Sequence, residues 1–402
     1  MAELTSTELL ARLLTGIDDE LPRAVELRRR LHSSPELAHE EHRTAATVAE
    51  ELPVPSDTVA ATGLIARIGS AEGAPVAVRA ELDGLPLAER TDAPFSADPG
   101  AGAMHACGHD VHMAALVALA RAAYALGEAA LPAPLLAVLQ PSEEAYPSGA
   151  AQLIDPLATR APVAIVAAHI HPELPWGSVA LDPGTINASC DHVAITVEGA
   201  AAHGAYPHRG RDPILALAEI VVSLHAQLGR RIDPLHPATL TVGVLEGGAA
   251  ENVIPERAHA RAALRAHRPE DRLALRTLVE EVVAGVARAH GCRGTVELTT
   301  GEPALANDPA IVARARELLA AAGLSAAPEW RSCGSDDFAF FSALEIPLAI
   351  GFVGLDGADG FAARPLHHPE LLPPDAAVGA VARAQAVLYL AAATSPPHDG
   401  RG

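Results

Sequence analysis

Thiol and imidazole side chains are concentrated between residues 104 and 114, in the sequence MHACGHDVHMA. Cys107 and His109 are two residues apart and immediately precede an apolar stretch with helical spacing, so one tight turn could direct both side chains at one point. A thiolate and an imidazole are typical ligands of zinc-type metal ions. Taken alone, the segment is also compatible with a His-rich loop that contains a buried cysteine.

Two adjacent acids, Glu143 and Glu144, follow an apolar run that reads as a strand, in LQPSEEAYPSGA. Ligands of open α/β sheets bind at the carboxyl ends of the strands. Neighbouring carboxylates at such an edge can divide the work, because one can bind a metal ion while the other takes a proton from water. Two acids in the first turn of a helix are the simpler alternative.

Two further histidine pairs lie at expected strand ends or loops. His169 and His171 come at the end of the apolar run in VAIVAAHIHPELPWG, and His367 and His368 lie in ARPLHHPE near the C-terminus. Side chains that can bind metal ions thus occur in four distant segments. This pattern is typical of a two-metal hydrolase whose site is assembled from discontinuous sequence.

The elements that must position these side chains alternate between helical and strand patterns. We predict helical structure over about 7–50 with a break at 33–35, a helix over about 110–126, and strands over 64–68, 76–80, 135–139 and 163–168. Strands separated by helices indicate an α/β domain with a mixed, mostly parallel sheet.

The middle of the chain has a different order of expected helices and strands. Expected strands at 192–197, 238–244, 258–264 and 294–298 are combined with helices at 213–228 and 269–290. Their order, β-α-β-β-α-β, is the ferredoxin-like arrangement. We therefore predict an inserted α+β domain over 188–299 between the two parts, 1–187 and 300–402, of the α/β domain.

Composition excludes several function classes. The 402 residues include 29 basic and 50 acidic side chains, which gives a net charge of −21 and disfavours nucleic acid as a partner. Every one of the 29 is Arg, so mechanisms that need a Lys amine, such as Schiff-base chemistry or a Walker-A phosphate site, are excluded.

The N-terminal sequence MAELTSTELLARLLTGIDDELP lacks the basic and apolar regions of a signal peptide, and we expect no segment of about 18 apolar residues that could cross a membrane. The four cysteines are far apart and have no CxxC spacing, which indicates free thiols in a reducing compartment. We expect a cytoplasmic protein without a membrane partner.

Eight segments together carry a family resemblance. They occur in the order RRLHSSPELAHEEHRTA, RAELDGLPLAE, MHACGHDVH, LQPSEE, GAAAHGAYPH, ENVIPERA, GSDDF and PLHHPE. The chain resembles peptidase family M20 over about residues 20–390, and is most similar to its amidohydrolase branch of aminoacylases, hippurate hydrolases and auxin-conjugate hydrolases. The resemblance implies a zinc-peptidase-like catalytic domain and an inserted lid or dimerisation domain.

The resemblance also implies site residues. It assigns the general base to Glu143 and a histidine-orienting role to Asp83. It assigns His203 to polarising the scissile carbonyl, in relatives from the other subunit of a dimer, and it assigns substrate contacts to Asn252 and Arg265. The implied metal ligands are Cys107, His109, Glu144, His169 and His367, for two divalent ions per subunit, Zn or Mn first and Co or Ni as alternatives.

We therefore expect a metal-dependent amidohydrolase that acts on N-acyl amino acids or similar small amides, in a homodimer or dimer-based oligomer. In this interpretation Arg265 could hold a substrate carboxylate through a bidentate contact, whereas His105, His112 and His171 support the ligands. Dipeptidase activity, a metal-independent thiol hydrolase with Cys107 as nucleophile, and a non-catalytic small-molecule-binding protein remain alternatives.

Three positions depart from the family pattern. Glu81 stands where relatives usually carry Asp, Asp336 stands where Glu is usual, and AYPSGA replaces a Gly-rich run after Glu144. The longer side chain of Glu81 could disturb the surroundings of the metals, and the changed loop borders the expected substrate pocket. The substrate preference of relatives is therefore not carried over.

Overall fold

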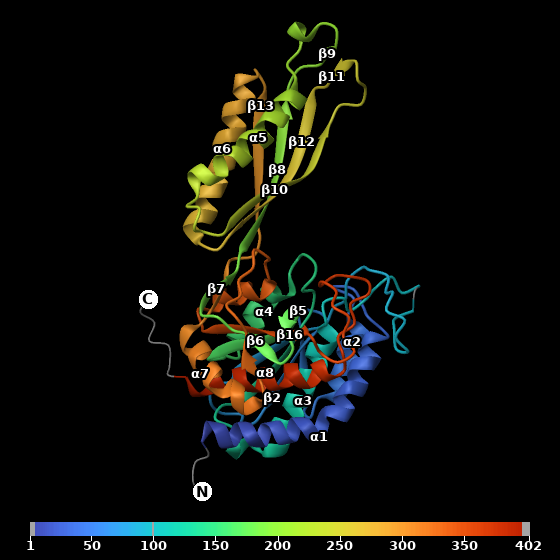
Figure 1. Ribbon diagram of the computed structural model, residues 1–402, viewed down its shortest axis with the longest axis vertical. Coiled ribbons are helices and arrows are strands. Elements are labelled where there is room, and N and C mark those ends of the chain that lie inside the picture. Colours follow the sequence, from blue (N-terminus) through green and yellow to red (C-terminus); the bar gives the residue numbers. More distant parts are fainter. Residues whose placement is uncertain (1–4, 99, 396–402) are drawn as a thin grey trace. The chain divides into compact units, whose positions relative to one another are not determined.

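A computed structural model describes residues 5–98 and 100–395 of the chain. The chain divides into two compact units (Figure 1). Unit 1 comprises 1–184, 307–330 and 340–402, and unit 2 comprises 185–306 and 331–339. The predicted insertion, 188–299, lies within the first segment of unit 2, whereas no sequence signal pointed to the second segment.

The sheet of unit 1 has eight described strands in the order β1-β2-β4-β3-β5-β16-β6-β15. Its four central strands, β4, β3, β5 and β16, run parallel, and antiparallel pairs join β2 to β4, β1 to β2 and β16 to β6. The strands are β1 (Ser56–Val59), β2 (Gly63–Ile68), β3 (Val76–Glu81), β4 (Leu135–Gln140), β5 (Ala164–Pro175), β6 (Ser178–Ala180), β15 (Ser325–Ala326) and β16 (Leu348–Asp356). The prediction of a mixed, mostly parallel sheet is confirmed.

Two predicted boundaries in unit 1 are wrong. The break in the N-terminal helical region extends to residue 41 rather than ending at 35, and the strand that carries His169 is longer than expected. β5 continues past the expected end at residue 168 to Pro175, because it stays paired with β16 as far as His171 and, after a register irregularity, at Pro175. His169 and His171 therefore lie within the strand and, two residues apart, on the same face of the sheet.

Helices cover this sheet. α3 and α8 pack on it, and α1 packs against both (Figure 1). The described helices of unit 1 are α1 (Ser6–His32), α2 (His42–Glu51), α3 (His109–Leu126), α4 (Gly149–Ala158), α7 (Pro309–Leu319) and α8 (Ala376–Thr394), with short 3-10 turns η1 (Glu128–Ala130) and η3 (Ala320–Ala322).

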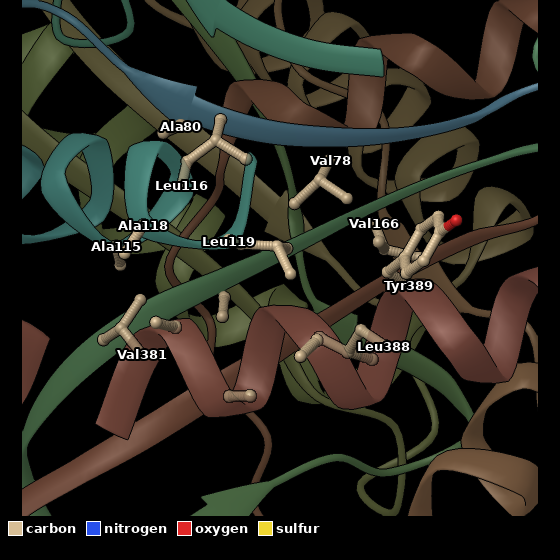
Figure 2. Packing of buried hydrophobic residues seen from close by; sticks show 14 of the residues in the cluster. Val78, Ala80, Ala115, Leu116, Ala118, Leu119, Val166, Val381, Leu388 and Tyr389 are labelled. Carbon is tan, nitrogen blue, oxygen red and sulfur yellow. The ribbon is translucent and has the colours of Figure 1, made fainter. Parts of the chain in front are cut away.

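The core of unit 1 is built mainly from Ala, Val and Leu. Figure 2 shows Val78 of β3 and Val166 of β5 against Leu116 of α3 and Leu388 of α8. Small alanines between them let the helices approach the sheet closely. α8 is long and apolar enough to cross a membrane by length and composition, so the expectation that no such segment exists is wrong, but 83% of its apolar window is buried in this core.

Unit 2 has the predicted β-α-β-β-α-β order. Its antiparallel sheet runs β13-β8-β12-β10, and α5 and α6 pack on it. The elements are β8 (Ser189–Glu198), α5 (Pro213–Arg231), β10 (Ala238–Gly247), β12 (Arg257–Ala266), α6 (Pro269–Ala289) and β13 (Arg293–Thr300), with a small pair of β9 (Ala202–His203) and β11 (Val253–Ile254) and the turn η2 (Pro207–Arg209). β7 (Gly184–Asn187), β14 (Leu305–Asn307) and η4 (Asp337–Leu344) lie where the chain passes between the units.

Candidate metal centre

Seven of the predicted site residues come together in unit 1. Their segments follow the carboxyl ends of β3 and β4, begin α3, lie in β5 or precede α8. Because β4, β3 and β5 are parallel neighbours, the segments at their carboxyl ends meet at one edge of the sheet. The residues are Asp83, Cys107, His109, Glu143, Glu144, His169 and His367.

Five of them, Cys107, His109, Glu144, His169 and His367, form a group that we call the cage. Cys107 Sγ lies 3.4 Å from His169 Nε2, and His367 Nε2 lies 3.1 Å from a carboxylate oxygen of Glu144. Donor atoms of Cys107, His109 and Glu144 all lie within 4.8 Å of one another. These spacings allow several side chains to share one or two cations.

A glycine makes the turn between the thiol and the first imidazole possible. Gly108 is the N-cap of α3 and has a left-handed φ of 83°, and a Cβ atom at this position would lie 2.3 Å from Ile170 Cδ1. Any side chain would therefore strain the backbone and collide with β5. The close approach directs Cys107 and His109 toward His169, as the two-residue spacing predicts.

The backbone conformation of His367 is also unusual, with a φ of 64°. Its N–H donates to the carbonyl of Ala106 at 2.8 Å, which ties the segment before α8 to the loop that carries Cys107. A non-glycine residue in this region costs free energy that surrounding contacts must offset, and such residues cluster at functional sites.

Hydrogen bonds at Nδ1 fix the tautomers of two cage histidines. The Nδ1–H of His109 donates to the carbonyl of Asp83 at 2.8 Å, and that of His169 donates to the carbonyl of Ile170 at 2.6 Å. In the neutral ring each Nε2 then carries the lone pair, the form that binds a metal ion. His109 Nε2 is buried and has no hydrogen-bond partner among the described residues.

Asp83 orients His109 through its main chain rather than its side chain. The carboxylate lies 3.6 Å from His109 Nδ1, too far for a strong hydrogen bond, whereas the carbonyl oxygen is at 2.8 Å. The Oδ2 atom of Asp83 instead accepts the N–H of Glu144 at 2.9 Å. The side chain therefore holds the loop that carries the two glutamates.

Glu81 is integrated into the centre. Its Oε2 accepts the Nδ1–H of His112 at 2.8 Å, and its other oxygen pairs with the buried guanidinium of Arg79. His112 Nε2 accepts the N–H of Ile170 at 3.0 Å, so both ring nitrogens are used and His112 supports β5, although its donor atoms lie close to those of Glu81, His109 and His169. Sequence reasoning missed Arg79; its signal is a basic residue within a fully buried strand, VAVRAE, two positions before Glu81.

The charge balance of the centre favours a cation. Burial lowers the pKa of His109, but the carboxylates of Glu81 and Asp83 outweigh it and raise the pKa to about 10. Burial and the carboxylates of Glu144 and Glu143 raise the pKa of the Cys107 thiol well above its usual range. A divalent cation would supply the positive charge that this acidic group lacks and would favour the thiolate. Imidazole, thiolate and carboxylate donors together fit such an ion.

A strained turn presents the two glutamates. Ser142 has a left-handed φ of 49°; its N–H donates to Glu41 Oε1 at 2.7 Å, and its Oγ lies 2.9 Å from His39 Nδ1 and 3.2 Å from the same Glu41 oxygen. The carbonyl of Ser142 accepts the N–H of Gly149, the first residue of α4. The next residue, Glu143, carries its carboxylate to 3.8 Å from His109 Nε2.

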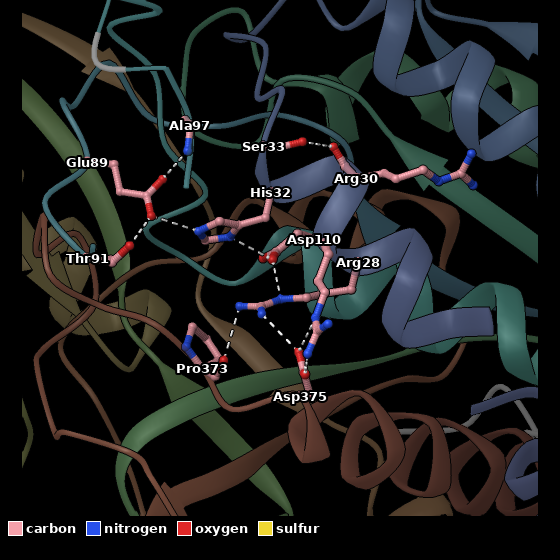
Figure 3. Close-up of polar contacts among 11 residues, drawn as sticks. Arg28, Arg30, His32, Ser33, Glu89, Thr91, Ala97, Asp110, Pro373 and Asp375 are labelled. Carbon is pink, nitrogen blue, oxygen red and sulfur yellow. Dashed lines mark hydrogen bonds and ion pairs between the residues drawn. The ribbon is translucent and has the colours of Figure 1, made fainter. Parts of the chain in front are cut away.

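A buried ionic network supports the start of α3 (Figure 3). Asp110, next to His109 in sequence, accepts from Arg28 Nε at 2.7 Å and lies 2.9 Å from His32 Nδ1, while His32 Nε2 lies 3.0 Å from Glu89. Burial lowers the pKa of His32, but these carboxylates outweigh it and raise the pKa to about 8. The network joins α1, α3 and the segment that carries Glu89.

The three predicted site residues of unit 2 do not converge within that unit. His203 on β9 and Asn252 lie together, because the Gly204 N–H donates to the Asn252 carbonyl at 2.7 Å and both side chains are exposed. Arg265 lies near the far end of β12, where it donates to the Cys333 carbonyl at 3.0 Å and approaches Ser335 Oγ at 3.4 Å. Arg265 thus holds the segment 331–339, and its contact with a substrate carboxylate stays a prediction.

Comparison with known families gives a match over most of the chain. The model of a family described as peptidase family M20/M25/M40 matches residues 77–389. N-acetyl-L-cysteine deacetylase from Bacillus subtilis is 35% identical over 351 residues, which cover 85% of this chain and 82% of that protein. N-acetyldiaminopimelate deacetylase from Halalkalibacterium halodurans is 33% identical over 362 residues, which cover 88% of this chain and 94% of that protein.

A solved structure agrees with these matches. A Bacillus subtilis protein described as a dinuclear metal binding peptidase from the M20 family superposes with a TM-score of 0.78 at 27% sequence identity. The superposition covers 93% of this chain and 98% of that one.

All four cysteines of this chain are free, as the scattered spacing predicts.

Proposed function

The chain belongs to peptidase family M20/M25/M40, and from that membership and the chemistry of the cage we propose that the protein is a binuclear metal-dependent amidohydrolase. Its reaction is hydrolysis of the amide bond of N-acyl amino acids or related small amides. The observation that carries the proposal is the donor set of the cage: the Nε2 atoms of His109 and His169, whose Nδ1 atoms are each bonded to a carbonyl, beside Cys107 and Glu144.

Two divalent ions bound there would lower the pKa of a water molecule and withdraw electrons from the amide carbonyl. Glu143 is the proton carrier, because its carboxylate lies beside the cage, 3.8 Å from His109 Nε2, and is still 17% exposed to solvent. It accepts a proton as the water oxygen bonds to the carbonyl carbon, and it delivers that proton to the nitrogen as the C–N bond breaks. Zinc and manganese suit the mixed N, S and O donors, with cobalt and nickel as alternatives.

Unit 2 contributes groups that contact the substrate. The Nδ1 of His203 accepts the N–H of Ala205 at 3.0 Å, which leaves the ring proton on Nε2 as a donor for a carbonyl oxygen. We assign this donor to the centre of the partner subunit in a homodimer, and we assign Asn252 and Arg265 to substrate binding. Two relatives are named for removal of the acetyl group from N-acetyl-L-cysteine and N-acetyldiaminopimelate, which supports acylated amino acids as the substrate class.

The experiment is a substrate panel combined with metal analysis of the same preparation. We expect wild-type protein to hydrolyse N-acyl amino acids, to lose activity with a chelator and to regain it with added metal. Glu143→Gln should keep the wild-type metal content and lose about 10³-fold in kcat, because the amide cannot accept the proton. Turnover near the wild-type value in this variant would remove Glu143 from its role.

The same preparation tests the thiol-hydrolase alternative. A Cys107 nucleophile predicts activity that resists chelators and is abolished by thiol alkylation of the metal-free protein. The raised pKa of the Cys107 thiol in its acidic surroundings argues against this alternative, because the thiolate is the reactive form. Dipeptide substrates in the panel distinguish the dipeptidase alternative from deacylation.

A further inference from the structure

A loop of unit 1 that carries none of the predicted site residues contacts the segment of His367. It runs over residues 85–104, of which the structure describes 85–98 and 100–104. Leu85 and Met104 close it, because the N–H of each donates to the carbonyl of the other, at 2.8 and 3.0 Å. Within the loop, the N–H of Arg90 donates to the carbonyl of Pro369 at 2.8 Å. We call residues 85–104 the clamp loop.

His367 depends on its main chain for its orientation more than the other cage imidazoles do. Its side chain is 51% exposed, whereas His109 and His169 are buried, so packing fixes its ring less. Its φ of 64° is a conformation that a residue with a Cβ atom keeps only where surrounding contacts hold it. One such contact is its own N–H bond to Ala106, and the bond from the clamp loop to Pro369 holds the chain two residues later.

An aromatic ring is the first anchor of the clamp loop. The guanidinium carbons of Arg28 and Arg29 lie 4.9 and 5.2 Å from the ring centroid of Phe95. The imidazole of His32 meets the same ring at 5.5 Å with an interplanar angle of 79°. A guanidinium within about 6 Å of an aromatic ring is attracted by its face, so three side chains of α1 hold Phe95.

A buried carboxylate is the second anchor. The side chain of Glu89 is 1% exposed, and its Oε1 lies 3.0 Å from His32 Nε2 (Figure 3). Its other oxygen accepts the N–H of Ala97 at 2.8 Å, which ties two parts of the clamp loop together. Glu89 directly precedes Arg90, so this anchor fixes the position of the N–H group that bonds Pro369.

We propose that the clamp loop holds His367 in its ligand conformation, with Phe95 and Glu89 as positioning residues for the metal ion that His367 binds. This inference rests on the proposed function, because it requires the cage to bind metal ions. Groups that orient a metal ligand raise the affinity of the site, since the ligand has less freedom to lose on binding. The clamp loop should therefore strengthen the binding of one ion and leave the other unchanged.

Zinc binding to the metal-free protein tests this role without any hydrolysis. The two stepwise dissociation constants are measured by competition with a chromophoric chelator. Phe95→Ala should raise one of them about 10-fold and change the other less than about 2-fold. Phe95→Tyr keeps the ring and should stay within about 3-fold of the wild type. Arg90→Ala is the matched control and should change neither constant more than about 2-fold, because the main chain makes the contact with Pro369.

A second background identifies the residue through which the clamp loop acts. In His367→Ala, which lacks the ligand, Phe95→Ala should change the remaining zinc affinity less than about 2-fold, because both substitutions affect the same ion. Glu89→Ala removes the other anchor and should follow the same pattern in both backgrounds. An equal loss in both backgrounds, a loss for both ions, or no loss at all would overturn the assignment.

The outcome is distinguishable from failure of the proposed function. If the wild type hydrolyses N-acyl amino acids but the zinc constants do not show this pattern, only the role of the clamp loop is overturned. If the pattern is present and the wild type hydrolyses no substrate of the panel, the clamp loop keeps its role and the proposed function is overturned.

Discussion

The two units treat their predicted functional residues differently. In unit 1 seven such residues are drawn to one edge of the sheet, and two of the three cage imidazoles, His109 and His169, are buried, whereas His367 is exposed. Each buried ring has a hydrogen-bond partner that fixes its tautomer. In unit 2 His203 and Asn252 lie exposed at one end and Arg265 lies at the other end of β12, bound to the segment 331–339.

This contrast teaches which part of the chemistry each unit can supply. Buried groups with fixed orientation are suited to hold cations, because the protein has already lost the freedom that binding would otherwise remove. Exposed groups on a small strand pair are suited to meet a substrate that arrives from solution. Variants that remove a donor atom of the cage should therefore change metal content, whereas variants in unit 2 should change rate alone.

The largest expected effect is on metal content. Glu144→Ala removes a cage carboxylate and should reduce the bound metal from two ions per chain toward one, with a loss of kcat/KM of at least about 10³-fold. Elemental analysis after gel filtration measures the stoichiometry. Glu128→Ala, which removes an exposed acid of η1, is the matched control and should leave both values unchanged. Two ions retained in Glu144→Ala would argue against ligation by this residue.

The next effect tests unit 2. His203→Ala removes one proposed donor to the carbonyl oxygen and should lower kcat about 10²- to 10³-fold, because one such donor typically contributes that much. Its metal content should equal that of the wild type, in contrast to Glu144→Ala. A drop in metal content here would remove the distinction between the two units.

Mixing two inactive variants sharpens this test. If His203 acts in the partner subunit, hybrids of His203→Ala with Glu143→Gln contain one centre with both groups intact, and activity should return to about a quarter of the wild-type value per total protein. Proven subunit exchange without recovered activity would assign His203 to its own chain.

The two units also show how far these features could be predicted from the sequence. The elements of both units were predictable because apolar periodicity decides helix and strand locally, and the β-α-β-β-α-β order of unit 2 followed from it. The convergence of Cys107, Glu144 and His169 was predictable because Cys107 immediately precedes an apolar helix, whereas Glu144 follows and His169 ends an apolar run that reads as a strand of a mostly parallel sheet. The full extent of β5 was not, because its last residues are paired by β16, far away in sequence.

Supporting residues of the site were harder to predict than its donor atoms. Arg79 neutralises Glu81 from within an apolar strand, and the carbonyl of Asp83 rather than its carboxylate orients His109. The attachment of 331–339 to unit 2 depends on Arg265, a contact across 68 positions of sequence. Such contacts depend on main-chain atoms and on long-range packing, neither of which leaves a spacing pattern.

Ser142 offers a smaller effect within unit 1. Ser142→Ala removes the hydroxyl contacts with His39 and Glu41 and places a Cβ residue at a φ of 49° without them, so the turn should relax and displace Glu143. We expect kcat to fall about 30-fold, since a displacement of about 1 Å in a reacting group can cost 10²-fold. Ser142→Gly, which adopts the left-handed conformation without strain, should lose no more than about 5-fold. Equal losses in both variants would mean that the hydroxyl, not the backbone conformation, is what matters.

The smallest effect distinguishes the units by the pH dependence of their stability. Burial and the carboxylates of Asp110 and Glu89 leave the pKa of His32 in unit 1 at about 8, above the value of 6.5 for an exposed imidazole. The protonated ring therefore stabilises unit 1 fully below pH 6.5, and about 2 kcal/mol is lost as the pH rises through 8. Burial lowers the pKa of His267 in unit 2, so that imidazole gives the opposite sign: unit 2 gains stability as the pH rises through the unfolded value.

Hydrogen exchange of the metal-loaded protein at pH 6 and pH 9, corrected for intrinsic rates, measures both units in one sample. Protection in α1 and α3 should fall by about 2 kcal/mol, whereas protection in α5 and α6 should not fall. His32→Gln is the control, because its side-chain amide cannot gain the proton. In this variant the protection of unit 1 should depend less on pH. If protection fell equally in both units between pH 6 and pH 9, the group that titrates would lie outside the network of Figure 3. Protection that is lost at pH 9 only in unit 1, and not in His32→Gln, would show that the stabilising charge lies in this network. That charge then stabilises α3, the helix that carries His109.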